Sequence, residues 1–250
     1  MKKFTKVIAA IMLMTAAVFT AGCKPEDSNN EGGNGTYNGH EYVDLGLPSG
    51  TLWATCNVGA NIPEKFGGYF AWGETMPKTY YDLSKYKYYN NNNETLTKYC
   101  NEGSYSDNLT TLRPTDDAAT ANWGNGWCMP IADQWRELLQ NTEQHWTTQN
   151  GVNGLHFIAN NGNSLFLPAA GYRHGLELSW VGSDVAYWSS SLSTDNQDYA
   201  WSNSGTYDFS SFGTESLDYA WDFGLGSVGE CLNPNPRWVG FSVRPVRSTR

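Results

Sequence analysis

Large aromatic rings recur from Tyr37 to Phe241 and are separated by glycines and short polar runs. Of the 250 residues, 14% are aromatic, 26 are glycine and only 16% are charged. A disordered chain would lack the aromatic residues, and a helical bundle or coiled coil would need many more charged and helix-forming residues. The sequence therefore predicts a fold of short strands, tight turns and long loops that is packed by large rings.

The chain is acidic, with a formal net charge of −9. The first 22 residues contain Lys2, Lys3 and Lys6 and no acidic residue, so their removal would leave 13 basic against 25 acidic residues. Such a surface repels phosphate groups. The charge therefore disfavours binding to nucleic acid and to anionic lipid head groups.

Residues 1–22 have the features of an export signal. The three lysines precede an apolar run at 7–18 that is too short to span a bilayer comfortably. Small residues then lead to Gly22 and Cys23, which resembles the lipobox of bacterial lipoproteins, although Thr20 stands where an aliphatic residue is usual. We expect Cys23 to be the acylated first residue of the mature protein. The alternative is an ordinary secretory signal followed by a structural cysteine.

The segment 23–39 is predicted to be a flexible tether. Residues 24–36 contain no apolar side chain that could order them by burial. Their acidic start resembles the signal that sends some lipoproteins of the Bacteroidota to the outer face of the cell. We therefore expect a protein anchored to the outer membrane by lipid, exposed at the cell surface, with its folded part at 40–250.

An even number of cysteines remains when Cys23 is set aside. In an exported chain this suggests two disulfides, for which three connectivities are possible. None of the four lies in a C-x-x-C pair, so their spacing gives little support to a zinc or thiol-redox site. The disulfide candidates are Cys56, Cys100, Cys128 and Cys231.

The apolar pattern predicts short strands and one hairpin. The expected strands are at 41–45, 51–58, 67–73, 186–191 and 238–246. The hairpin joins 155–158 to 164–167 through an Asn- and Gly-rich turn. Residues 76–111, which are dense in Tyr, Asn and Lys, are expected to form a long surface excursion pinned by tyrosine rings.

Two helices are also predicted. One lies in the stretch 114–119, with Thr115 as its N-cap and acidic residues in its first turn. The other runs over 131–140, where Ile131, Trp135, Leu138 and Leu139 form one apolar stripe. Helices among many short strands indicate the α+β class.

Six segments resemble the motifs of the Fibrobacter succinogenes major paralogous domain, in the same order. They are YVDLGLPSGTLWA at 42–54, YFAWGE at 69–74, WCMP at 127–130, FLPAAGYR at 166–173, YWSSS at 187–191 and FSVRPV at 241–246. Cys128 stands where that family usually has Arg, which favours a disulfide at this position. Ile131 stands where a Thr would cap the helix, and such a cap contributes about 1 kcal/mol.

The resemblance implies a C-type-lectin-like fold, which that family shares with formylglycine-generating enzymes and with the variable proteins of diversity-generating retroelements. It implies short twisted antiparallel sheets, two helices and long ordered loops. The formylglycine-generating relatives need a pair of reactive cysteines near the C-terminus, and here Cys231 stands there alone. The sugar-binding calcium motifs of C-type lectins are incomplete, so no cofactor is expected beyond the possibility of a structural calcium ion.

No pattern in the sequence indicates a catalytic site. The four histidines form no metal-ligand spacing, and the serines at 189–191 lack the glycines of a nucleophile elbow. Asp116 and Asp117 could form a carboxylate pair for glycoside hydrolysis, but a solvated capping cluster is the expected role. We therefore expect a protein that is not an enzyme.

The segment 195–238 is the predicted contact region. Stiff rings interleaved with small polar residues resemble the chemistry of antibody contact loops. The predicted contact residues are Tyr199, Trp201, Asn203, Tyr207, Asp208, Phe209, Phe212, Tyr219, Trp221 and Asp222. Tyr207, Phe209 and Phe212 lie in a Gly- and Ser-rich loop, whereas Trp201, Trp221 and Trp238 favour the core.

The sequence thus predicts a lipid-anchored surface module that binds an extracellular protein or a glycan. One variant of this hypothesis is a retroelement-diversified binding protein. Two alternatives from other classes are an atypical hydrolase or oxidase on a formylglycine-generating-enzyme-like fold, and a structural protein of the surface layer or matrix.

Overall fold

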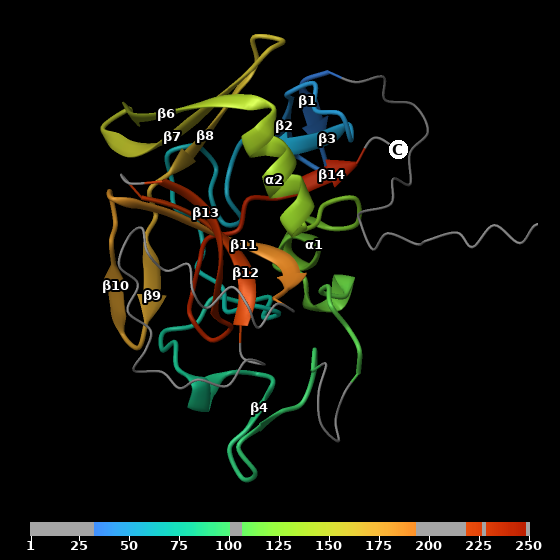
Figure 1. Ribbon diagram of the computed structural model, residues 1–250, viewed down its shortest axis with the longest axis vertical. Helices are drawn as coiled ribbons and strands as arrows, with labels where there is room; N and C mark the ends of the chain where they lie inside the picture. Colours follow the sequence, from blue (N-terminus) through green and yellow to red (C-terminus); the bar gives the residue numbers. More distant parts are fainter. Residues whose placement is uncertain (1–32, 101–106, 194–218, 227–228, 249–250) are drawn as a thin grey trace, which may run out of the picture.

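The computed structural model describes residues 33–100, 107–193, 219–226 and 229–248, and between 219 and 234 it gives the course of the backbone. These residues form an α+β fold of small antiparallel sheets with two α-helices, as the sequence predicts (Figure 1). The α-helices are α1 (Ala118–Trp123) and α2 (Ala132–Gln140), and the 3₁₀ turns are η1 (Leu83–Lys85) and η2 (Pro114–Asp116). The strands are β1 (Gly35–Tyr37), β2 (His40–Asp44), β3 (Thr51–Ala54), β4 (Tyr89–Asn90), β5 (Thr95–Leu96), β6 (Thr142–Gln149), β7 (Val152–Ala159), β8 (Ser164–Pro168), β9 (Tyr172–His174), β10 (Glu177–Ser179), β11 (Asp184–Leu192), β12 (Tyr219–Gly226), β13 (Gly229–Pro236) and β14 (Val246–Ser248).

The first sheet joins the two ends of the described chain, in the order β1-β2-β3-β14. β1 lies inside the segment that was expected to be a tether, so the folded part begins by Gly35 rather than at His40. The reason is the tight turn at Asn38 and Gly39, both with positive φ, which folds β1 back onto β2. An Asn-Gly pair of this kind is a strong hairpin signal.

The second sheet has the order β6-β7-β8 and contains the hairpin expected from the sequence. β6 was not expected, because its eight residues are mostly polar and exposed and give no apolar alternation. It forms through its pairing with β7 across the turn at Asn150 and Gly151. Glu64, from the loop after β3, accepts hydrogen bonds from Gln149 at 2.7 Å and Asn150 at 2.6 Å and fixes that turn to the body.

Three further sheets, with four strand pairings, complete the described strands. β11 pairs with β12 and β12 with β13, β4 pairs with β5, and β9 pairs with β10 in a short hairpin. Figure 1 shows β4 at one end of the long axis and β9–β10 along one side of the molecule. β11 confirms the strand expected at 186–191 and extends it by two residues before and one after.

The helices differ from expectation in how they begin. Asp117, not Thr115, caps α1, and its side chain accepts the N–H of Thr120 at 3.0 Å. α2 lacks a capping side chain at Ile131, yet two acceptors replace it: Gln134 accepts the Ile131 N–H at 2.9 Å, and Ser191 of β11 accepts the Ala132 N–H at 3.1 Å. A neighbouring strand thus supplies the missing cap.

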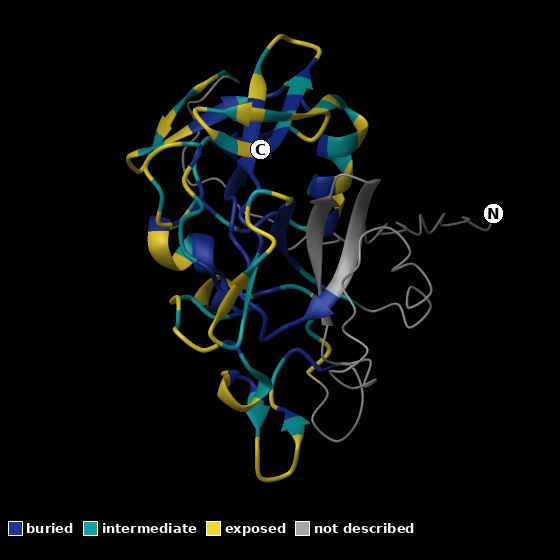
Figure 2. Ribbon diagram, turned by 90° about the vertical axis from the view of Figure 1, so that its left-hand side faces the viewer, coloured by how far each residue is buried: buried dark blue, intermediate teal, exposed yellow. Residues whose placement is uncertain are grey.

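The rings pack in two buried clusters, drawn in dark blue in Figure 2. One lies between α2 and the strands β3, β7, β8 and β11, with Trp53 against Trp135 at a centroid distance of 4.6 Å. The larger one holds Trp72, Trp188 and Phe241. As expected, Trp135 and Leu138 of the α2 stripe are fully buried.

Two expected strands are wrong. The segment 238–246 is buried, but before β14 it makes only isolated bridges, from Gly240 to Arg173, from Phe241 to Phe70 and from Ser242 to Tyr187. The segment 67–73 likewise contributes a single bridge at Phe70. Apolar runs predict burial, but here the chain changes its neighbour at almost every residue, so no regular ladder forms.

Neither α-helix of the described ranges is long and apolar enough to cross a membrane.

Candidate binding surface

Most of the contact residues expected from the sequence lie outside the described residues. The contact residues outside the description are Tyr199, Trp201, Asn203, Tyr207, Asp208, Phe209 and Phe212. Cys23, the expected site of lipid attachment, also lies outside it. Tyr219, Trp221 and Asp222 lie on β12, between β11 and β13, and their side chains are outside the description. Trp238, which was expected in the core, is buried. Contact by this segment therefore stays a prediction.

The cysteines follow the expected disulfide framework only in part. Cys128 is disulfide-bonded, as its place in the resemblance suggested. Cys56 and Cys100 are both thiols, so the expectation of two disulfides is wrong for these two. They follow β3 and β5, which belong to different sheets. Cys231 lies on β13, and its side chain is outside the description.

Tyrosine hydroxyls pin the excursion at 76–111 to the body, as the sequence predicts. Tyr81 donates to the backbone oxygen of Tyr69 at 2.5 Å, and Tyr86 donates to that of Trp72 at 2.8 Å. The Tyr88 hydroxyl donates to the Gly73 oxygen at 3.3 Å. Their rings are buried, so each residue contributes apolar packing and also satisfies a carbonyl.

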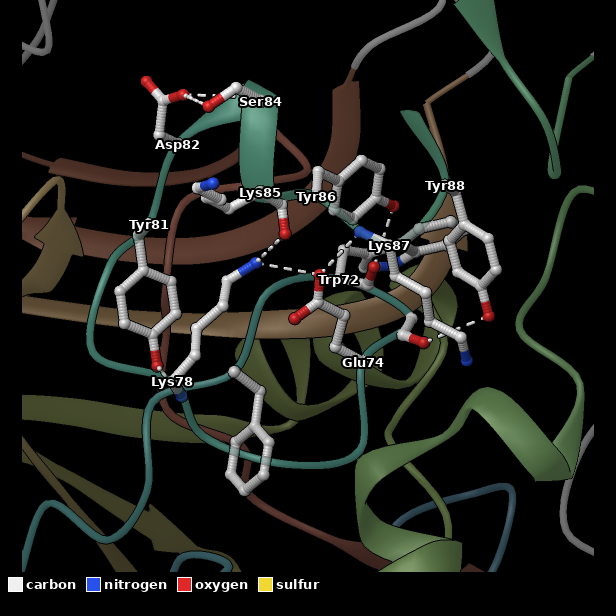
Figure 3. Close-up of polar contacts among 12 residues, drawn as sticks. Trp72, Glu74, Lys78, Tyr81, Asp82, Ser84, Lys85, Tyr86, Lys87 and Tyr88 are labelled. Atoms are coloured by element: carbon white, nitrogen blue, oxygen red, sulfur yellow. Dashed lines mark hydrogen bonds and ion pairs between the residues drawn. The ribbon is translucent and has the colours of Figure 1, made fainter. Parts of the chain in front are cut away.

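Glu74 holds the same excursion from its polar side (Figure 3). Its Oε1 accepts the Lys87 N–H at 2.9 Å and pairs with Lys78 Nζ at 2.8 Å. Lys78 in turn donates to the Lys85 oxygen at 3.1 Å. The charges in this region are therefore used within the fold.

Asp116 is the centre of a second polar cluster. It pairs with Lys98 and with Lys87, whose Nζ is 3.1 Å from Oδ1, and it accepts the Tyr99 hydroxyl at 2.7 Å. Burial alone would raise the pKa of this carboxyl, but hydrogen bonds from Lys98, Tyr99 and Lys87 outweigh it and hold the pKa well below the usual range. Asp116 therefore stays ionised and supports the excursion.

The neighbouring carboxyl of Asp117 is also structural. Burial raises its pKa to about 6, although N–H groups of Thr120 and Met129 donate to its two oxygens. The expectation of a solvated cluster is wrong, because Asp116 and Asp117 are both buried. Both oxygens of each carboxylate are engaged by the fold, so the pair serves packing and capping rather than the hydrolysis of a substrate.

Two buried arginines attach the C-terminal segment to distant parts of the fold through hydrogen bonds to backbone oxygens. Arg237 donates to the oxygens of Lys98 and Tyr99, at 3.3 and 3.0 Å, and lies over the Trp72 ring. Arg244 donates to the oxygens of Ala54 and Thr55 at 3.0 and 2.8 Å, and its Nε donates to Asn57 at 2.8 Å. Arg244 belongs to the FSVRPV motif, which thus has a structural role here.

In contrast to these buried groups, one apolar surface faces solvent at the β9–β10 hairpin. We name it the apolar hairpin face and define it as Tyr80, Leu176, Leu178, Trp180 and Val181. These side chains are exposed by 42%, 72%, 40%, 44% and 43%, respectively. Tyr80 belongs to the same surface because the next residue, Tyr81, bridges to Gly175 at the hairpin turn. Large exposed apolar side chains gathered on one hairpin and the loop beside it are typical of contact sites.

The turn that carries Trp180 is strained and rigid. Trp180 has φ of 61°, a region that a bulky residue rarely adopts, at a cost of about 1–3 kcal/mol. Its backbone oxygen accepts the N–H groups of Ser183 and Asp184, both at 3.1 Å, and the Ser183 hydroxyl at 2.9 Å. Gly171 packs so closely below that a Cβ there would lie 2.0 Å from the Ser179 oxygen. The neighbouring structure therefore fixes this conformation.

A buried carboxyl lies at the base of this turn. Asp184 is 4% exposed, and no described residue forms a hydrogen bond to its Oδ2. Burial raises the pKa of Asp184 to about 7, and the N–H of Val185 lowers it only in part. The titratable side chain that interacts with it is Tyr172 on β9.

The hairpin could have been found from the sequence. Leu176, Leu178 and Trp180 alternate with Glu177 and Ser179, which is the pattern of a strand with one apolar face. That pattern does not tell whether the apolar face is covered.

Comparisons with known proteins assign no family to the chain. No protein-family model matches the chain, and neither curated proteins nor solved structures give a significant match. Within the described residues, no group of three or more His, Cys, Asp or Glu side chains is placed to hold a metal ion.

Proposed function

We propose that the protein is a binding module of the C-type-lectin-like fold, anchored at the cell surface through lipid on Cys23, that recognises another protein through the apolar hairpin face. It acts by binding and not by catalysis, and it needs no cofactor. The observation that carries this proposal is the exposure of Leu176, Leu178 and Trp180 on a hairpin whose turn is rigidly held.

The chemistry of the face favours a protein over a glycan. Three of its five side chains are Leu or Val, which gain free energy from the burial of apolar area. A sugar site needs convergent hydrogen-bonding groups beside its rings, whereas the one charged side chain on β10 is Glu177. Trp180 and Tyr80 are the residue types that most often dominate protein contacts.

The test is a binding screen with the full chain against an array of extracellular proteins and an array of glycans. We expect hits among the proteins, and we expect them to be lost when Leu176, Leu178 and Trp180 are all replaced by Ser. The matched control replaces Ile62 and Trp146, which have similar exposure elsewhere, by Ser and should bind normally. Hits that survive the hairpin variant, or hits confined to glycans, would refute the assignment of this face.

The predicted aromatic segment is tested separately. Replacing Tyr207, Phe209 and Phe212 together by Ala should weaken a second contact if that loop also binds. Unchanged binding of every array hit would remove the loop from the proposal and leave the hairpin face as the site.

A further inference from the structure

The hydrogen-bond pattern of the β9–β10 hairpin determines which backbone groups of β10 point away from β9. On β9, Arg173 exchanges backbone hydrogen bonds with Gly240, 2.9 Å each, so its N–H and C=O point away from β10. Gly175 does the same with Tyr81, at 2.9 and 2.7 Å. Because this direction alternates along a strand, Tyr172 and His174 are the β9 residues that face β10.

Leu178 therefore presents its backbone outward. It lies opposite Arg173, in a pair that exchanges no hydrogen bonds, while Glu177 and Ser179 pair with His174 and Tyr172. In the described part of the chain, no strand pairs with β10 on its other side, and no backbone group bonds Leu178. The Leu178 N–H and C=O are thus available to another chain.

The side chains around this edge also have the pattern of a strand that awaits a neighbour. Leu178 lies in the middle of β10, Leu176 and Trp180 flank the strand at its two ends, and all three side chains are exposed. Proteins usually protect such an edge with Lys, Pro, a bulge or a covering loop. Among the residues that the structure describes, β10 has none of these, and its one charge is the exposed carboxylate of Glu177.

We infer that an extended segment of the partner protein adds to β10 as a third antiparallel strand, with apolar residues facing Leu176, Leu178 and Trp180 and a basic residue facing Glu177. This inference rests on the proposed function and specifies how its partner binds. Read from the partner's N-terminus, the pattern is apolar, any polar, apolar, basic, apolar, with the central residue opposite Leu178.

Charge favours a different protein over a second copy of this chain. Without residues 1–22, each of two copies would carry 13 basic against 25 acidic residues, and neither strand β10 has a basic residue to place opposite Glu177. A basic residue in the partner strand instead faces the carboxylate directly, and opposite charges across a strand pair are stabilising.

The experiment uses fluorescein-labelled peptides and fluorescence anisotropy with the purified full chain. The probe peptide contains Val-Thr-Val-Lys-Val between Ser-Gly ends, and the comparison peptide has Glu in place of Lys. We expect the lysine peptide to bind about tenfold more tightly than the glutamate peptide, and Glu177→Lys to reverse this preference. An equal affinity for both peptides, or no binding of the lysine peptide, would overturn the inference.

Leu178→Pro blocks the edge without touching the hairpin, because the Leu178 N–H makes no bond to β9. It should weaken the lysine peptide about tenfold or more, whereas Leu178→Ala keeps the N–H and should weaken it less. Thermal unfolding by circular dichroism checks that both variants are folded. Equal binding by Leu178→Pro and Leu178→Ala would overturn strand addition.

The outcomes separate this inference from the proposed function. If Leu178→Pro keeps the array hits while the Ser variant of the hairpin face loses them, the face binds but not by strand addition. If neither variant loses them, the proposed function fails as well. A dimer that sedimentation detects in wild type, and that Leu178→Pro abolishes, would replace the partner protein by a second copy.

Discussion

Replacing Asp184 by Asn should change how the stability of the protein depends on pH. In the folded state the pKa of Asp184 is about 7, against 3.8 for an unperturbed aspartate, because the carboxyl is buried and its Oδ2 has no partner. The folded state therefore holds this proton more tightly than the unfolded state does. Below pH 4 the carboxyl is protonated in both states and burial costs little.

The cost grows as the pH rises. Between about pH 4 and pH 7 the unfolded chain releases the proton and the folded chain does not, so the free energy of unfolding falls by about 1.4 kcal/mol per pH unit. Over about three units this amounts to on the order of 4 kcal/mol, and above pH 7 the loss is constant. An asparagine carries no charge and escapes this loss, although its amide group adds a constant cost of about 1–3 kcal/mol where Oδ2 has no partner.

The assay is urea unfolding followed by tryptophan fluorescence at pH values from 4 to 8, for wild type and Asp184→Asn in parallel. Other titrating groups, including Asp116 and Asp117, contribute equally to both proteins and cancel in the difference. We expect the stability of the variant relative to wild type to rise by several kcal/mol from pH 4 to pH 8. A difference that stays constant with pH, or that falls, would refute the burial of an ionisable, unpartnered carboxyl at this position.

Four further changes test other parts of the structure. Asp116→Asn should destabilise the fold by about 2–4 kcal/mol at pH 7, because Lys87 and Lys98 lose their carboxylate partner. Folding lowers the pKa of Asp116, so the destabilisation should shrink as the pH falls below 4, which calorimetric scans can measure. Ser191→Ala removes the acceptor at the start of α2 and should cost about 1 kcal/mol in guanidinium unfolding, with no loss expected if the cap were not used. Gly171→Ala places a methyl group against the Ser179 oxygen at a residue with positive φ. It should lower the melting temperature and abolish array binding. Normal binding by this variant would show that the conformation of the Trp180 turn is not needed for the contact. Cys23→Ala should remove radioactive palmitate label from the protein, and an unlabelled wild type would end the proposal of a lipid anchor.

Local sequence patterns were sufficient where each element has its own apolar periodicity. The stripe of α2 and the alternation of the β7–β8 hairpin depend on neighbours a few residues away, so both were predictable. The same holds for the tyrosines of the excursion, since a ring with a hydroxyl needs both burial and a hydrogen-bond partner. Tyr81 and Tyr86 have both.

The predictions from sequence failed where residues far away along the chain determine the conformation of a segment. The polar strand β6 exists because β7 pairs with it, and Ser191 replaces a cap that the local sequence lacks. The apolar run at 238–246 signals burial correctly but not geometry, because Gly240, Phe241 and Ser242 each bridge to a different segment. No window of sequence contains those partners.

The candidate site could be recognised only from the exposure of its side chains in the folded structure, which the sequence pattern does not give. Leu178 and Leu165 are both leucines in short strands, yet Leu165 is buried in the core and Leu178 is exposed. Leaving a large apolar side chain in water forgoes about 1.5–3 kcal/mol of burial, and the positive φ of Trp180 costs about 1–3 kcal/mol more. Within the described residues, hydrogen bonds from Ser183 and Asp184 hold the turn at Trp180, but Leu176, Leu178 and Trp180 keep 72%, 40% and 44% of their surface exposed. A partner strand on β10 would bury Leu176, Leu178 and Trp180 and would pair the outward backbone of Leu178, so one contact would recover the burial that these side chains lack.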